Sequence, residues 1–471
     1  MRTDGGTGDQ AEYPVSGERQ PDDYADLAQL FATAEADAAS EHRHRSSPEV
    51  TVTTLRKRKR RRIIAGIATL AVAAIIGTYL SLVFTAPLAN ATIEVRDAAV
   101  ESPEAAVIAV PEGVVSAVSV SGAEAFDGTA GVDGVLASSG GNDPRPIASI
   151  TKLIAALVIL EAKPLAAGES GPGITFTEAD EDLYDHYYVL GATIQPLEGG
   201  STMTERDALE FMLIPSATNY AEAVTRWAFG SNDAFRQAAA AWLAARGFTG
   251  TTIVEPTGLD PRNTSTPTEL IAIARLALAH PVLAEIVAMR STDVPGTKSA
   301  PNTNSLLGVE GVTGIKTGTL DEAGSCLLFS ATMNAGSGSP ISVVGVVLAS
   351  ESRRSAQVEA ERLLESIRAG FHHVPVVGKG DSVATLTTPW GEQANVVAQA
   401  GAAVLTWSDM PISVEIEIDP VSTAAAGTRV ATATYASGEQ TQSVELLLAS
   451  AIEAPDGWWR ITHPTELFAA R

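Results

Sequence analysis

The chain has 471 residues, which is long enough for two or three domains with substantial cores. Its formal net charge of -24 argues against nucleic acid as a partner, because phosphates would be repelled. The single cysteine, Cys326, rules out an intramolecular disulfide and lies in an apolar run typical of a buried strand, so we assign it no chemistry.

A basic cluster followed by an apolar run stands near the start of the chain. Residues 56–62 read RKRKRRR, and the 22 residues at 63–84 carry no charge. As a helix this run would span about 33 Å, enough for a bilayer core. A cleaved signal peptide is the alternative, with small residues at 86–91, but the run is longer than a usual signal core. We therefore expect an uncleaved transmembrane helix in contact with membrane lipid.

The basic cluster also predicts how the chain is oriented. Lys and Arg are retained on the cytoplasmic side of a membrane, so residues 1–62 are expected in the cytoplasm and residues 85–471 outside it. Residues 1–62 show little apolar periodicity and are expected to be disordered, apart from a short helix near residues 22–39. Residues 85–104 are expected to form a linker.

Residues 105–371 alternate between strand and helix patterns. Alternating runs at 105–140 predict two or three strands, and amphipathic segments between 204 and 290 predict helices. Strand patterns return between 312 and 349, before a closing amphipathic helix. This order predicts an α+β domain whose sheet is completed by distant segments. Residues 182–191 (DLYDHYYVLG) are expected to form a structural loop.

Residues 372–471 are rich in Val, Thr and Ala and contain alternating stretches such as ISVEIEID and TRVATATYA. They contain no long helical run. We expect a separate, small β-sandwich.

Ser149 and Lys152 stand three positions apart in PRPIASITKLIAALVILE, residues 144–161, where a loop passes into an apolar helix. The common interpretation is that Ser149 caps the helix and Lys152 is solvated. The alternative is catalytic, because a hydroxyl nucleophile needs a neighbouring base. Lowering the pKa of a lysine to about 7 to 8 requires roughly 4 kcal/mol of destabilisation by burial or a nearby cation. Positions i and i+3 share a helix face, so the two side chains can meet once buried.

Two later segments favour the catalytic interpretation. Lys316, Thr317 and Gly318 form a Lys-Thr-Gly sequence on a predicted strand, and Ser216 lies on a loop entering a helix. A Ser-x-x-Lys, a Ser-x-Asn type and a Lys-Thr-Gly motif, in this order, are the set found in class A β-lactamases and penicillin-binding proteins. Each motif is weak alone, but the three together are specific.

Residues from about 105 to 370 resemble the D-alanyl-D-alanine carboxypeptidases, the low-molecular-mass penicillin-binding proteins of serine peptidase family S11. The likeness extends beyond the three motifs to EPTGLDPRNTST, NTNSLLG and GVTGIKTGTLDEAG. It implies a penicillin-binding-protein and β-lactamase-like transpeptidase fold, in which an antiparallel sheet is flanked by helices and a helical subdomain. The tail resembles, less specifically, the β-rich C-terminal domain of such proteins.

The resemblance implies a membrane-anchored carboxypeptidase acting on peptidoglycan stem peptides that end in D-Ala-D-Ala. Ser149 would attack the carbonyl between the two D-alanines, and Lys152 would take its proton. Ser216 would bridge Lys152 and Lys316 and relay the proton to the departing amine. Lys316 would provide positive potential for the substrate carboxylate, and Thr317 would hydrogen-bond it.

The resemblance also assigns backbone roles. Gly318 would let the strand approach the substrate closely, and the N–H groups of Ser149 and Thr319 would form the oxyanion hole. Water would then hydrolyse the ester, so no metal or cofactor is implied. β-Lactams are expected to acylate the same serine.

One departure from the family pattern lies in SATN, residues 216–219. The family usually has Asn at the third position of this motif, where this chain has Thr218, with Asn219 next. Neighbouring side chains at a helix start point about 100° apart, so we expect Thr218 in the site and Asn219 outside it. Thr303 stands near the place where some family members have an arginine.

Two other functions are considered. A class A β-lactamase would need a catalytic glutamate in a Glu-x-x-x-Asn segment, and the sequence between the second and third motifs contains none. A binding or scaffolding protein with an impaired site is the alternative from another class, motivated by Thr218 and Thr303. Glu255, in EPTGLD, is interpreted as a residue beside a turn and not as a catalytic acid.

Overall fold

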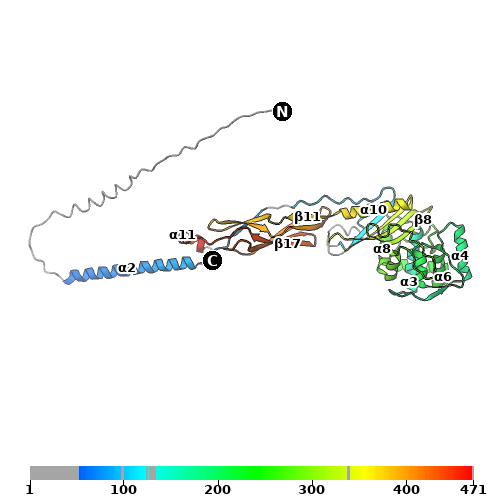
Figure 1. Ribbon diagram of the computed structural model, residues 1–471, viewed down its shortest axis with the longest axis horizontal. Helices are drawn as coiled ribbons and strands as arrows, with labels where there is room; N and C mark the ends of the chain where they lie inside the picture. The colour runs from blue at the N-terminus through cyan, green and yellow to red at the C-terminus, as the bar shows by residue number, and fades with distance from the viewer. Residues whose placement is uncertain (1–51, 97–99, 124–125, 127–133, 337–339, 469–471) are drawn as a thin grey trace, which may run out of the picture. The chain divides into compact units, whose positions relative to one another are not determined.

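The computed structural model describes residues 52–96, 100–123, 126, 134–336 and 340–468 (Figure 1). The predictions for residues 1–51, including the short helix near residues 22–39, lie outside the described residues. Met1–Leu82 and Val83–Arg471 form two compact units, and each is described by itself.

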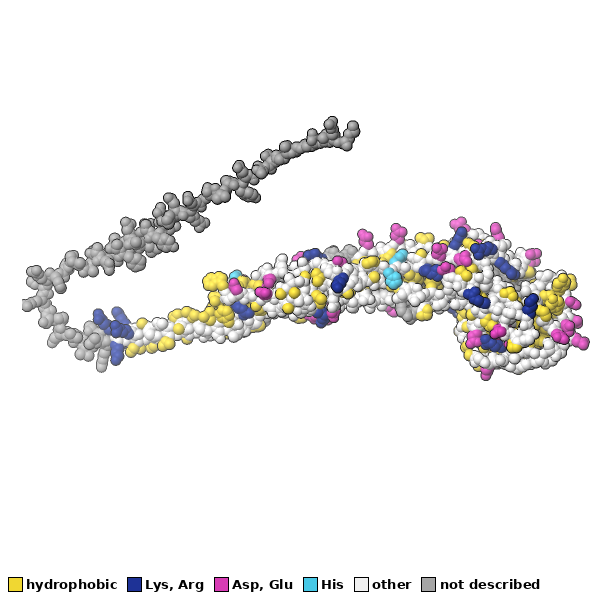
Figure 2. Space-filling view, viewed as in Figure 1, with side chains coloured by type: hydrophobic (Ala, Val, Ile, Leu, Met, Phe, Trp, Pro, Cys, Tyr) yellow, Lys and Arg dark blue, Asp and Glu magenta, His cyan; other side chains and the backbone are white. Residues whose placement is uncertain are grey.

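Helix α2 spans Val52–Thr85, longer than the 63–84 expected, because the preceding Lys and Arg residues favour helix. Its segment Arg58–Thr85 has 28 residues and a mean hydropathy of 2.2. Basic side chains gather at the start of this segment, and hydrophobic side chains follow along it (Figure 2). Among the described residues, α2 is the one unbent helix long and apolar enough to cross a membrane.

Strands between residues 115 and 350 form a five-stranded antiparallel sheet in the part of the chain around β8 (Figure 1). Its strands lie in the order β3, β2, β10, β9, β8, so β2 pairs with a strand more than 200 residues later in the chain. The bounds are β2 (Val115–Ser121), β3 (Ala137–Ser139), β8 (Val312–Leu320), β9 (Gly324–Met333) and β10 (Ile341–Ser350). As the strand patterns predicted, distant segments complete this sheet.

Both faces of the sheet are buried. On β10, Val344, Val346 and Leu348 belong to one hydrophobic core, and Val343 and Val347 belong to another. Helix α10 (Arg353–Ala369) packs into the second core. The first core continues into a group of helices, which are α3 (Thr151–Ala162), α5 (Glu205–Leu213), α6 (Thr218–Phe229), α7 (Asn232–Ala245), α8 (Pro267–Ala279) and α9 (Pro281–Ala288).

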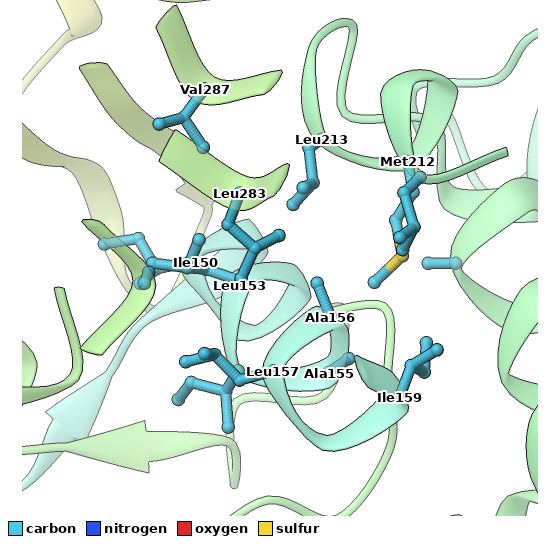
Figure 3. Close-up of a cluster of buried hydrophobic side chains, with 14 of the residues drawn as sticks. Ile150, Leu153, Ala155, Ala156, Leu157, Ile159, Met212, Leu213, Leu283 and Val287 are labelled. Carbon is cyan, nitrogen blue, oxygen red and sulfur yellow. The ribbon is translucent and has the colours of Figure 1, made fainter. Parts of the chain in front are cut away.

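Helix α3 lies at the centre of this helical core, with ten of its twelve residues buried. Ile150 and Leu153 lie near Leu283 and Val287, and Ala156 and Ile159 face the side of Met212 and Leu213 (Figure 3). A helix that is apolar on all sides requires neighbours on all sides. The start of α3 is therefore held in one position by helices on one side and the sheet on the other.

The expected loop at residues 182–191 is wrong, because these residues belong largely to helix α4 (Glu178–Val189). Thr177 and Asp180 form a capping box at its start, and three acidic residues in the first turn complement the helix dipole. The remaining short elements of this region are β4 (Arg145–Pro146), β5 (Gly173–Thr175), β6 (Thr202–Thr204) and β7 (Thr264–Ser265).

Strands dominate from residue 371 onward. A six-stranded antiparallel sheet has the order β1, β12, β13, β17, β16, β15, and β11 pairs separately with β14. β1 (Thr92–Val95) comes from the segment expected to be a linker and pairs with β12. The other elements are β11 (Phe371–Val377), β12 (Ser382–Thr387), β13 (Gln393–Ala398), β14 (Ala402–Trp407), β15 (Ser413–Ile418), β16 (Arg429–Ser437), β17 (Gln440–Leu448), α11 (Gly457–Thr462) and α12 (Pro464–Phe468).

Candidate active site

Ser149 lies in a short 3-10 turn, Ala148–Ile150, directly before α3. The N-cap of α3 is Ile150, which makes no side-chain cap, so Ser149 does not occupy the capping position. Its hydroxyl instead accepts a hydrogen bond from Lys152 Nζ at 2.9 Å. The local sequence thus brings the two side chains together through their i and i+3 spacing.

Lys152 is fully buried at the start of α3. Its ammonium donates a second hydrogen bond, of 2.6 Å, to the carbonyl oxygen of Thr257. Burial lowers the pKa of Lys152 to about 8, while the carboxylate of Glu255 acts in the opposite direction. With this pKa about a tenth of the amine is unprotonated at pH 7 and available as a base, far more than for an ordinary lysine.

Lys316 is the second buried lysine and lies on β8, with 1% of its surface exposed. Its ammonium donates to the carbonyl oxygen of Thr317 at 3.1 Å. Burial lowers the pKa of Lys316 well below its ordinary value, and the charges of Lys152 and Arg353 lower it further. Two amines that repel each other in one site cannot both hold a proton easily.

Ser216 lies between α5 and α6 and is 5% exposed. Thr303 connects the loop of Ser216 to β8. The Thr303 N–H donates to Ile214 O, in that loop, at 3.2 Å, and the Thr303 hydroxyl accepts from Thr317 Oγ1, on β8, at 2.6 Å. Within the part of the chain that the structure describes, however, no hydrogen bond joins the Ser216 hydroxyl to either lysine, whose ammonium groups donate to Ser149, Thr257 and Thr317. The expected bridge through Ser216 therefore stays a prediction.

Two residues of the site have left-handed backbone that a side chain rarely adopts. Ser216 has φ of 66°, and Ala148, directly before Ser149, has φ of 48°. Each such residue costs on the order of 1 to 3 kcal/mol and is held in place by its surroundings. Strain of this kind clusters at functional sites, and here it is found in both serine-bearing turns.

The side chains of Asn219 and Thr218 differ in their hydrogen bonding. The Asn219 amide is bound to loop backbone, since Oδ1 accepts from Gln195 N at 3.2 Å and Nδ2 donates to Gln195 O at 2.8 Å. The Thr218 hydroxyl makes no hydrogen bond to another described residue, while its backbone N–H donates to Thr193 O at 2.7 Å. This arrangement leaves Thr218, the residue we expected in the site, with the free polar group.

Gly318 lies against the turn that carries Ser149. A Cβ built on Gly318 would stand 3.0 Å from both Ile147 O and Ser149 N, and 2.9 Å from the Ala148 Cβ. Any side chain at this position would push β8 away from the turn. The glycine therefore brings the backbone of Thr319, the next residue on β8, close to that of Ser149.

Arg353 is a residue of this region that the sequence reasoning did not single out. It is the first residue of α10, and its Nε donates to Thr319 Oγ1 at 3.1 Å. Its charge is one of those that lower the pKa of Lys316. The sequence SRRSAQ, after the last strand of the sheet, predicts a helix start with two arginines. That this helix start lies beside Thr319 depends on how α10 packs on the sheet and is not visible in the sequence.

A cavity of ≈ 1100 Å³ lies elsewhere, and its walls include Asp185, Phe211, Tyr220, Val294 and Lys298. None of the predicted site residues lines it, so the site is defined by its side-chain geometry and not by this cavity. No group of three or more His, Cys, Asp or Glu side chains among the described residues is arranged to hold a metal ion.

Comparison with known proteins gives the class and then the family. A family model described as D-alanyl-D-alanine carboxypeptidase matches residues 120–351. The D-alanyl-D-alanine endopeptidase of Pseudomonas aeruginosa is 31% identical over 234 residues, which are 48% of this chain and 70% of the relative. The endopeptidase of the same name from Escherichia coli is 27% identical over 233 residues, again 48% of this chain and 70% of the relative.

Solved structures give similar matches. A peptidoglycan synthesis regulatory factor (PBP3) from Streptococcus pneumoniae is 22% identical with a TM-score of 0.48, covering 74% of this chain and all of that one. Penicillin-binding protein 5 of Haemophilus influenzae is 18% identical with a TM-score of 0.48, covering 75% of this chain and all of that one.

The family model and the two curated relatives identify a peptidoglycan-acting hydrolase. The chain belongs to the D-alanyl-D-alanine carboxypeptidase family, S11, whose members are serine hydrolases that act on D-Ala-D-Ala peptides. The expected family and the α+β fold of the penicillin-binding type are both confirmed.

Proposed function

We propose that the protein is a membrane-anchored serine D-Ala-D-Ala carboxypeptidase that removes the terminal D-alanine from peptidoglycan stem pentapeptides and is inhibited by penicillins. The observation that carries this proposal is the 2.9 Å contact between Ser149 Oγ and the fully buried amine of Lys152, whose pKa is lowered to about 8. A buried lysine of lowered pKa beside a serine is the arrangement that activates a hydroxyl nucleophile.

In the proposed reaction the neutral amine of Lys152 takes the proton from Ser149 Oγ as this oxygen attacks the carbonyl carbon. The C–N bond to the terminal D-alanine then breaks, and the leaving nitrogen receives a proton through Ser216. An ester remains on Ser149, and water hydrolyses it with Lys152 again acting as base. The backbone N–H groups of Ser149 and Thr319 stabilise the oxyanion in both halves, which the close approach at Gly318 supports.

The proposed binding site for the substrate carboxylate is the end of β8. Lys316 and Arg353 supply positive charge, and the Thr317 and Thr319 hydroxyls supply hydrogen bonds, with Thr218 contributing to the peptide amide. Thr303 stands near the place where some family members have an arginine, and Arg353 would supply the positive charge that Thr303 lacks.

Replacing this cation should weaken substrate binding. We expect Arg353→Met to raise KM for a D-Ala-D-Ala peptide by about tenfold, because one charge-assisted contact to the carboxylate is lost, with kcat changed far less. Steady-state D-alanine release measures both constants. Arg354→Met, which removes a neighbouring exposed arginine, is the control, and an equal effect in both variants would contradict the assignment.

Gly318 gives a prediction about geometry. We expect Gly318→Ala to slow acylation by penicillin by about 100-fold or more, because a methyl group displaces the Ser149 turn from β8. The acylation rate of the full chain in detergent measures this. Gly401→Ala is the matched control, since a Cβ there meets its neighbours only at 3.5 Å or beyond, and normal acylation in Gly318→Ala would show that the close approach is not needed.

A second candidate function is cleavage of peptide cross-links, because both curated relatives are named D-alanyl-D-alanine endopeptidases. The same acyl-enzyme chemistry serves both reactions, and only the leaving group differs. The proposal commits to the terminal D-alanine as the leaving group.

The test compares two substrates with the full chain in detergent micelles. D-Alanine release from a pentapeptide that exceeds cleavage of a cross-linked peptide dimer is expected. Faster cleavage of the dimer would assign the endopeptidase activity. Penicillin binding without turnover of either substrate would assign a binding or scaffolding role, and rapid hydrolysis of penicillin would assign a β-lactamase.

We also propose the topology and domain limits expected from the sequence, with residues 1–62 cytoplasmic, the span at 63–84, and catalytic and β-rich domains at 105–371 and 372–471 outside the membrane. The hydropathy of α2 and its basic start support this. The native Cys326 is buried, and burial raises the pKa of its thiol to about 11, so it gives little background in thiol labelling. The proposed orientation is tested with Ser413→Cys, because Ser413 is exposed and lies in the part of the chain expected outside the membrane. This cysteine should react with an impermeant maleimide on intact cells. Ser437→Cys would not serve, because Ser437 is buried.

A further inference from the structure

The turn after Val254 is organised by one carboxylate. Glu255 accepts hydrogen bonds from the backbone N–H groups of Thr257 at 2.5 Å, Gly258 at 2.7 Å and Asp260 at 3.3 Å. The side-chain amide of Asn263 donates to the same carboxylate. Four donors on one carboxylate fix its position and that of the turn around it.

This turn contacts the Ser149 and Lys152 region in two places. The carbonyl oxygen of Thr257 accepts the 2.6 Å hydrogen bond from Lys152 Nζ. Gly258, with φ of 83°, lies so close to the backbone of Ala148 that a Cβ on it would stand 2.1 Å from Ala148 O. Holding the turn therefore holds both the amine and the peptide unit before the nucleophile.

The turn is also tied to the strand leading into Ser149. Asn263 is fully buried, its Oδ1 accepts from Val254 N at 2.7 Å, and its carbonyl oxygen accepts from Ile147 N at 3.1 Å. A chain of hydrogen bonds thus runs from Glu255 through Asn263 to Ile147, two residues before Ser149.

Several charged or titratable groups face this pair. Glu255 is the one charge that raises the pKa of Lys152, while Lys316 on β8 interacts with Lys152 and Arg353 of α10 interacts with Lys316. Tyr187 of α4 interacts electrostatically with Glu255. Burial acts against protonation of Lys152, and the carboxylate of Glu255 acts in favour of it.

We propose that Glu255 is a positioning residue for Lys152, because its carboxylate fixes the turn whose Thr257 carbonyl holds the amine and places the compensating negative charge of the site. This inference deepens the proposed function and rests on it. An amine made too weak a base by burial takes up a serine proton poorly. Glu255 keeps Lys152 basic enough to work while its own oxygens stay bound to backbone.

The test measures the rate of acylation by benzylpenicillin against pH, with the full chain in detergent. In Glu255→Gln we expect the ascending limb of the profile to move to lower pH by about half a unit to one unit, because the charge that raises the lysine pKa is gone. We also expect the plateau to fall by about tenfold, because an amide cannot accept from all four donors.

Glu269→Gln is the matched control. Glu269 likewise fixes a turn, accepting from Gly250 N at 2.8 Å and Thr251 Oγ1 at 2.5 Å, but it is not among the charges that act on Lys152. Glu269→Gln should lower thermal stability and leave the ascending limb of the acylation rate at the same pH as in the wild type. Glu255→Asp keeps the charge on a shorter side chain, so it should retain the wild-type limb with a lowered plateau.

Each outcome decides the inference. A folded Glu255→Gln whose limb matches the wild type assigns Glu255 a structural role only and overturns the proposal. If that variant does not fold, Glu255→Asp decides, and a wild-type plateau in it overturns the positioning role. A wild-type chain that penicillin does not acylate overturns the proposed function as well, whereas a reactive wild type with an unshifted variant overturns this inference alone.

Discussion

Ser149→Ala is expected to abolish both D-alanine release and covalent labelling by penicillin, with turnover lowered by about four to six orders of magnitude. The variant has no oxygen that can form the ester, and the groups around it, however well placed, have nothing to activate. The fold should be unaffected, because the Ser149 hydroxyl does not cap α3 and accepts its one recorded hydrogen bond from Lys152.

The measurement combines D-alanine release with mass spectrometry of the chain after incubation with benzylpenicillin. An adduct of one penicillin on the wild type and none on Ser149→Ala is expected. Ser138→Ala, which removes an exposed serine of β3, controls for loss of any hydroxyl and should behave as wild type. A penicillin adduct on Ser149→Ala would move the nucleophile to another residue and contradict the proposed mechanism.

The contact between Ser149 and Lys152 was predictable because it is local. Two side chains three positions apart at a helix start are neighbours in any fold that buries them, and the apolar run from Leu153 to Leu160 predicted burial. The sheet was predictable for the same kind of reason. Runs such as Val343 to Leu348 are apolar at every position, which is typical of a strand buried on both faces.

The second partner of the Lys152 amine was not predictable from spacing. It is the carbonyl oxygen of Thr257, which lies 105 residues away in the sequence and carries no side-chain signal for this contact. The charge of Glu255 and the approach of Arg353 to Thr319 depend in the same way on how the turn, α10 and the sheet pack. Local patterns contain no information about such pairs.

Two local expectations failed for reasons visible in the sequence afterwards. The segment DLYDHYYVLG contains few strong helix formers, yet the capping box of Thr177 and Asp180 and the acidic first turn start α4 there. The strand Thr92–Val95 is only four residues long and pairs with β12 almost 300 residues later. A strand of this length stabilises itself only through its partner, so its own sequence gives a weak signal.

Lys152→Met is expected to lose activity and gain stability. Without the amine, acylation of Ser149 loses its base, and a decrease of about 10² to 10⁴-fold in the acylation rate is expected. The methionine side chain fills similar space and carries no charge into the core. Acylation by benzylpenicillin and thermal unfolding of the same preparation measure the two effects.

The lowered pKa of Lys152 determines the direction in which stability changes with pH. The folded pKa of Lys152, about 8, lies below the ordinary value of 10.5, so between these pH values the unfolded chain binds a proton that the folded chain does not. The wild type should therefore become more stable as pH rises from 8 to 10.5, and below pH 8 the full destabilisation, about 3 kcal/mol, is present. Lys152→Met should melt several degrees higher at pH 7. Its advantage should shrink toward pH 10, because deprotonation of Lys152 removes the cost of the buried charge from the wild type. A variant that melts below the wild type at pH 7 would mean that the buried amine is stabilised by its contacts with Ser149 and Thr257 more than burial destabilises it.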